Sequence, residues 1–103
     1  MLRSVGQRPM AGGEDVRVTG LRSAVSRLSR ELAAHPAEFP DRGIAEEELA
    51  TLAAMARDGI PEIFRLRRCL LLIASALGSV SALAGGLAAV RAAVDLFGEP
   101  PRR

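Results

Sequence analysis

A long stretch without charge, from Cys69 to Val90, constrains the fold of this chain more than any other feature. It reads CLLLIASALGSVSALAGGLAAV, and arginines close it at both ends. About 20 apolar residues in a row is the length of a helix that crosses a membrane. The same length also suits the central helix of a soluble helical assembly. The stretch is therefore either a membrane span or the central helix of a soluble protein, and the residues around it are needed to decide between the two.

The composition favours helices over a sheet and one domain over several. The aromatic residues are three phenylalanines, and the apolar residues are mainly Leu, Val, Ile and Ala, which suit helix packing. A chain of 103 residues is the length of a single domain. Cys69 is the only cysteine, and no apolar segment follows the first arginines as in a secretory signal. We therefore expect a reducing, cytoplasmic location.

The sequence predicts an all-α protein with three helices, at about 14–35, 41–58 and 61–97. Apolar residues of the first helix recur at spacings of 3 and 4, namely Val18, Leu21, Val25, Leu28 and Leu32. Asp41 is the expected N-cap of the second helix, and Gly59 favours the left-handed conformation that ends it. Residues 14–98 form the predicted helical domain, and 1–13 and 99–103 the predicted disordered tails.

The third predicted helix is long and contains the stretch without charge. Apolar residues keep the same 3 and 4 spacing from Ile63 to Phe97, across charged residues on both sides of the stretch. A membrane span has no reason to keep that register outside the bilayer. This favours a soluble helix, which is either continuous or bent near Gly78 or Gly85-Gly86. A single-pass membrane protein spanning at 69–90 remains the alternative.

The long helix also predicts a homodimer. Ala74, Gly78, Ala82 and Gly86 recur every four residues, and small residues at this spacing let two helices approach closely. Two short helices are too small to cover the apolar faces of the long one, so a second copy is expected to complete the bundle. The predicted dimer interface consists of Leu70, Ile73, Ala74, Leu77, Gly78, Val80, Ala82, Gly86 and Leu87.

No motif for catalysis, a metal or a cofactor stands out, so the prediction is a protein that is not an enzyme and has no cofactor. The lone His35 lies beside a helix end, and the serines have no neighbouring base to activate them. Arg65, Arg67 and Arg68 could contact a polyanion, which gives a helical nucleic-acid-binding dimer as a second alternative. A formal net charge of only +2 and the nearby acidic residues favour a solvated surface instead.

The segment from Ala45 to Gly98 resembles a helical module of uncharacterised actinobacterial proteins. It reads AEEELATLAAMARDGIPEIFRLRRCLLLIASALGSVSALAGGLAAVRAAVDLFG. An Ala/Glu/Leu helix, a turn and a Leu/Arg-rich start lead into a long Ala/Gly/Val helix. The resemblance implies an interaction module in regulatory or effector-associated settings and carries no site residues. The predicted function is a small non-catalytic interaction or regulatory protein that acts as a homodimer and binds an unidentified protein partner.

Overall fold

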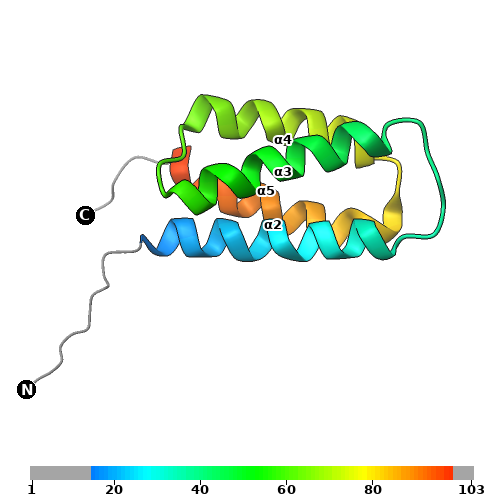
Figure 1. The fold of residues 1–103 in the computed structure, drawn as a ribbon, viewed down its shortest axis with the longest axis horizontal. Helices are drawn as coiled ribbons and strands as arrows, with labels where there is room; N and C mark the ends of the chain where they lie inside the picture. Colours follow the sequence, from blue (N-terminus) through cyan, green and yellow to red (C-terminus); the bar gives the residue numbers. More distant parts are fainter. Residues whose placement is uncertain (1–14, 99–103) are drawn as a thin grey trace, which may run out of the picture.

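The computed structural model describes residues 15–98, which form four α-helices around one core (Figure 1). The described part contains no strand. The predicted tails, 1–13 and 99–103, lie outside the described residues. The four helices are α2 (Val16–Ala34), α3 (Arg42–Asp58), α4 (Ile63–Leu77) and α5 (Ala84–Gly98), with the short 3-10 helix η1 (Ser81–Leu83) before α5.

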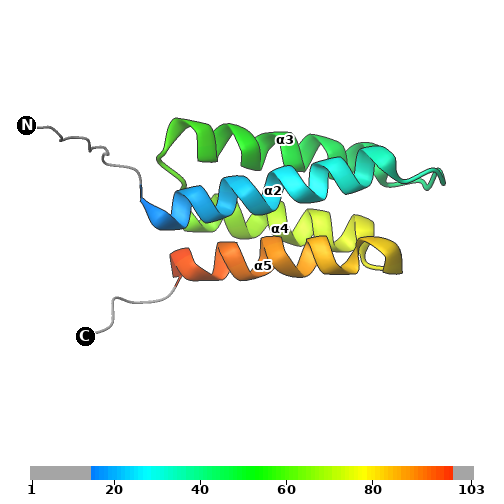
Figure 2. The same ribbon diagram turned by 90° about the horizontal axis from the view of Figure 1, so that it is seen from below.

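The helices form an up-and-down bundle. Each one packs against its neighbours in the chain, and α5 closes the ring by packing against α2. Figures 1 and 2 show the four axes running nearly side by side, with the start of α2, the α3–α4 turn and the end of α5 at the same end. Short connections between antiparallel neighbours give this topology.

The prediction of a third helix over 61–97 is wrong, and the bundle has four helices instead of three. The chain leaves α4 at Leu77 and turns through Gly78 and Ser79, and Val80 is extended (φ −99°, ψ 93°). The sequence Gly78-Ser79-Val80-Ser81 joins four residues with weak helix propensity. Folding back there lets α5 cover the apolar faces of α2 and α4. Of the two predicted bend positions, only Gly78 lies at the turn, since Gly85-Gly86 lies inside α5.

One hydrophobic core fills the centre of the bundle. The predicted face of the first helix is confirmed, because all five of its apolar residues are buried in α2. Among the described residues no polar or charged side chain is buried. The largest fully buried residues come from every helix, and they include Leu21, Leu28, Leu52, Leu66, Ile73, Leu77, Leu83 and Val94.

Arg42 fixes the connection between α2 and α3. Its guanidinium donates hydrogen bonds to the backbone oxygens of Leu32 (2.6 Å), His35 (2.9 Å) and Ala37 (3.0 Å). These oxygens belong to the end of α2 and the loop after it, where carbonyl groups lack helical partners and a cation is favourable. The same guanidinium lies 6.0 Å from the ring centre of Phe39. One side chain therefore holds the loop against the first turn of α3.

Candidate protein-interaction surface

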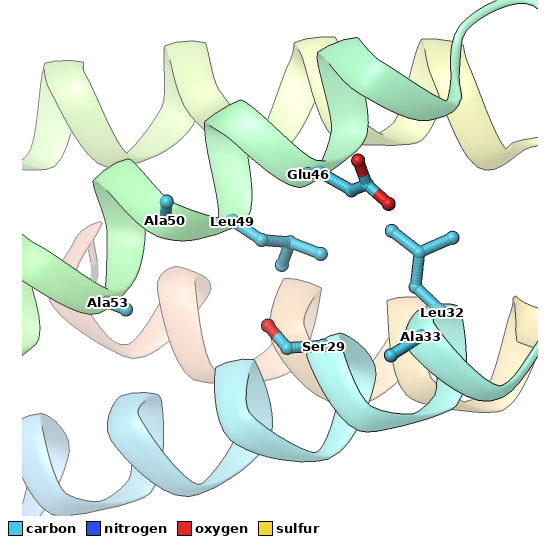
Figure 3. A pocket seen from close by; sticks show the side chains of 7 residues that line it. All are labelled: Ser29, Leu32, Ala33, Glu46, Leu49, Ala50 and Ala53. Carbon is cyan, nitrogen blue, oxygen red and sulfur yellow. The ribbon is translucent and has the colours of Figure 1, made fainter.

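A groove runs along the outer face of the bundle between α2 and α3. It contains two cavities, of about 190 and 350 Å³, that share Ser29 and Ala53 and therefore adjoin. Figure 3 shows the first cavity, with Leu32 and Leu49 reaching into the space between the two helices. We call the two cavities together the α2–α3 groove, and its lining is Arg22, Val25, Ser26, Ser29, Leu32, Ala33, Glu46, Leu49, Ala50, Ala53 and Arg57.

Small side chains leave this groove hollow. The floor is apolar, because Val25, Leu32 and Leu49 are buried core residues. The walls carry one stripe from each helix at spacings of 4, 3 and 4, so each stripe lies along one helix face. The α2 stripe is Arg22, Ser26, Ser29 and Ala33, and the α3 stripe is Glu46, Ala50, Ala53 and Arg57.

The two ends of the groove carry opposite charges. At one end Glu46 lies beside Ala33, and its carboxylate accepts a hydrogen bond of 3.3 Å from Arg42. At the other end Arg22 and Arg57 line the same cavity. The Arg22 guanidinium donates to the backbone oxygen of Ala56 at 3.2 Å, which holds it across the end of α3. The groove therefore has the Glu46 carboxylate, paired with Arg42, at one end and two arginines at the other. Between them Ser26 accepts a hydrogen bond of 2.7 Å from the Arg30 guanidinium at the edge of the groove.

A second surface without charge covers the outside of the α4–α5 hairpin. The stretch Cys69 to Val90 is split between the two helices and their turn, so many of its residues face solvent. Leu71 is 69% exposed, although it is a large apolar residue. We call this the hairpin surface, and it consists of Leu71, Ser75, Gly78, Ser79, Ser81, Ala82, Ala84 and Ala88.

The residues predicted for the dimer interface do not share one surface. Ile73, Leu77, Gly86 and Leu87 are buried in the core of the same chain. Leu70, Ala74 and Val80 are partly buried, and Gly78 and Ala82 are exposed. The residues separate because the chain turns at Gly78, so that some of the predicted interface residues pack in the core of their own chain.

The three arginines predicted to contact a polyanion also separate. Arg65 and Arg68 line a pocket of about 220 Å³ between α3 and α4, together with Glu48, Thr51 and Cys69. Arg67 points toward α5 instead, and its Cζ lies 3.1 Å from the place a Cβ on Gly98 would take. Since Glu48 shares the pocket, the structure does not gather these arginines into one positive patch.

Cys69 is buried beneath that pocket. Burial raises the pKa of its thiol to about 11, and the Glu48 carboxylate contributes in the same direction. Both effects disfavour the thiolate, which is the nucleophilic form. Cys69 thus behaves as a small core residue. Within residues 15–98, no group of three or more His, Cys, Asp or Glu side chains could hold a metal ion.

The predicted membrane span at 69–90 is not a single helix, because the turn at Gly78 divides it. By length and composition alone, one helical segment in the described part could cross a membrane, Ser81–Gly98, with a mean hydropathy of 1.3. In the bundle 33% of that segment is buried. Helices that form the core of soluble proteins meet the same criteria, so the segment does not by itself indicate a span.

Sequence reasoning missed the α2–α3 groove. The sequence does contain its signal, since each of the first two predicted helices has a second stripe with small residues at its centre. That stripe lies beside the buried face, and its small residues do not mark where the buried face ends.

A model of a family described as being of unknown function, DUF5955, matches residues 10–98. The search of curated proteins and the search of solved structures found no match.

Proposed function

This chain belongs to the DUF5955 family of unknown function, and we propose that it is a small non-catalytic interaction protein of the cytoplasm that acts as a homodimer. In this proposal the bundle offers one surface to a second copy and another to a different protein. Binding to such a partner gives the protein a regulatory role. The actinobacterial origin that the resemblance implied stays a prediction.

The observation that carries the proposal is the hairpin surface. A solvated helix face normally carries charged residues, and here a long exposed stretch carries none. The small side chains on it allow the close approach of another chain, and Leu71 offers an apolar contact.

Exposed apolar residues at one end of the bundle support the same proposal. Val16, Ile60, Phe64 and Leu96 are each at least half exposed. They come from the start of α2, the α3–α4 turn, the start of α4 and the end of α5, which lie together at one end (Figure 1). Association with another chain would remove part of this apolar area from water.

Light scattering coupled to size-exclusion chromatography tests the homodimer. At micromolar concentration we expect a mass of about twice the 10.9 kDa of one chain. A mass of one chain over the whole accessible concentration range would contradict the proposal.

The hairpin surface needs a separate test. Affinity capture from the native host with the wild-type protein and with Leu71→Arg should differ, because a charge at that position must be desolvated on binding. We expect a partner that the variant loses, while the matched variant Ser23→Arg on the outside of α2 keeps it. Equal recovery with both variants would argue against the hairpin surface.

A further inference from the structure

We propose that the second copy docks on the α2–α3 groove in an antiparallel, two-fold arrangement that pairs Glu46 of each copy with the Arg57 of the other. The inference rests on the homodimer proposed above and names the surface that forms it. It leaves the hairpin surface free for a different protein.

The positions of the charges on α3 carry the inference. Glu46 and Arg57 lie at the two ends of the α3 stripe, about 16 Å apart along the helix at 1.5 Å per residue. A two-fold axis that passes between Thr51 and Leu52, perpendicular to the helix, sets each charge against the opposite charge of the other copy. The same axis places Ala50 against the Ala53 of the other copy. A two-fold interface requires such a self-complementary surface.

The α2 stripe is symmetric about the same two-fold axis. Its midpoint lies between Arg27 and Leu28, so that Ser26 faces the Ser29 of the other copy. Ala33 and Glu46 both line the cavity at one end of the groove, and Arg22 and Arg57 both line the cavity at the other end. The midpoints of both stripes therefore lie at one level of the bundle, and a single axis serves both helices.

Side-chain size favours a second copy over a bulkier occupant. Ser29, Ala50 and Ala53 are small, so the two copies can approach closely along α3. On α2 the Arg30 guanidinium donates a hydrogen bond of 2.7 Å to Ser26 and lies at the edge of the interface. Close approach covers the exposed methyl groups of Ala33 and Ala50, since the floor residues are already buried in one chain. The charged ends then fix direction and register, since a parallel arrangement would set like charges against each other.

The test exchanges the charges in the full-length protein. Glu46→Arg alone and Arg57→Glu alone each place like charges at both ends of the interface, and we expect each to raise the dimer dissociation constant at least tenfold. The double variant Glu46→Arg/Arg57→Glu restores opposite charges and should return to within about threefold of wild type. Sedimentation equilibrium measures the constants, and circular dichroism verifies that each variant is folded.

Two further variants separate the explanations. Ala50→Arg puts a large side chain next to the axis and should weaken the dimer without changing the charges at the ends. Leu71→Arg lies on the hairpin surface and should leave the dimer intact. If neither the single charge exchanges nor Ala50→Arg changes the dimer dissociation constant, the dimer forms through another surface, and this interface is wrong. A wild-type chain that is monomeric throughout would overturn both the interface and the homodimer.

Discussion

Gly86 determines how closely α5 approaches α2. A Cβ placed on it would lie 2.9 Å from Leu28 Cδ1 and would also meet the Glu31 carboxylate. Leu28 is fully buried and has little room to move. The other oxygen of the Glu31 carboxylate accepts a hydrogen bond of 3.1 Å from Arg27, so this side chain is held as well.

We expect Gly86→Val to lower the free energy of unfolding by about 1–3 kcal/mol, because added atoms would overpack the contact. Chemical denaturation measures the change. Gly20→Val is the matched control, since nothing lies within 4 Å of a Cβ at Gly20. That variant should stay within about 0.5 kcal/mol of wild type. Equal effects at the two sites would show that the α2–α5 contact is not tight.

Arg42 stabilises the bundle through the shape of its guanidinium as well as its charge. Lys keeps the charge but lacks the planar fork that reaches the oxygens of Leu32, His35 and Ala37 together. We expect Arg42→Lys to lose about 1.5–3 kcal/mol of stability in a denaturation experiment, the range for hydrogen bonds that involve a charged group. An unchanged midpoint would mean that these bonds contribute nothing to stability.

The raised pKa of Cys69 predicts a thiol that resists alkylation. Its pKa rises from 9.0 to about 11 on folding, so the native thiol stays protonated at pH 8. Iodoacetamide should modify it much more slowly than it modifies the unfolded chain, as followed by mass spectrometry. Equal rates in the native and unfolded protein would contradict the burial of this residue.

The same shift makes stability depend on pH. Above pH 9 the unfolded chain releases the thiol proton while the native chain keeps it, so the free energy of unfolding should fall between pH 9 and pH 11. Cys69→Ala should show a shallower fall over this range. Identical pH profiles of the two proteins would assign the loss to other groups.

At the scale of the elements, the first two helices could be predicted from sequence and the last two could not. The apolar spacing of α2 and the residues at the ends of α2 and α3, Asp15, His35 and Gly59, are all local signals. Between α4 and α5 the apolar spacing continues in phase through the turn. A periodic pattern therefore cannot distinguish one long helix from a hairpin at this point.

The candidate surfaces were less predictable than the helices. The hairpin surface depends on the turn at Gly78, and the groove depends on which residues of α2 and α3 face each other. Both are properties of the packed bundle. Arg42 was missed for the same reason, because its acceptors lie in the loop and at the end of the preceding helix.

An insertion tests whether Gly78-Ser79-Val80 is a turn. Two glycines inserted between Ser79 and Val80 lengthen a loop, so we expect a loss of less than about 1 kcal/mol and unchanged helical content. The same insertion between Ser75 and Ala76 interrupts α4 and shifts its core residues, and should unfold the protein. Circular dichroism with thermal unfolding compares them. Equal damage from both insertions would contradict the turn.

At the scale of the whole molecule, the hairpin converts a sequence typical of a long apolar helix into half of a four-helix bundle. It brings the start of α4 beside the end of α5, where Ile63 Cδ1 lies 3.5 Å from the place of a Cβ on Gly98. The hairpin surface follows from this arrangement. The bundle and the hairpin surface therefore both require that the chain folds back at Gly78.

A distance between spin labels at positions 64 and 95 shows whether the chain folds back at Gly78. The labels are attached to cysteines introduced by Phe64→Cys and Asp95→Cys in a Cys69→Ala background, and the labelled protein is diluted with unlabelled chain to remove distances between copies. Pulsed electron paramagnetic resonance should give a distance below roughly 25 Å, since packed helix axes lie about 10 Å apart. A distance of about 46 Å, as in a continuous helix at 1.5 Å per residue, would contradict the account.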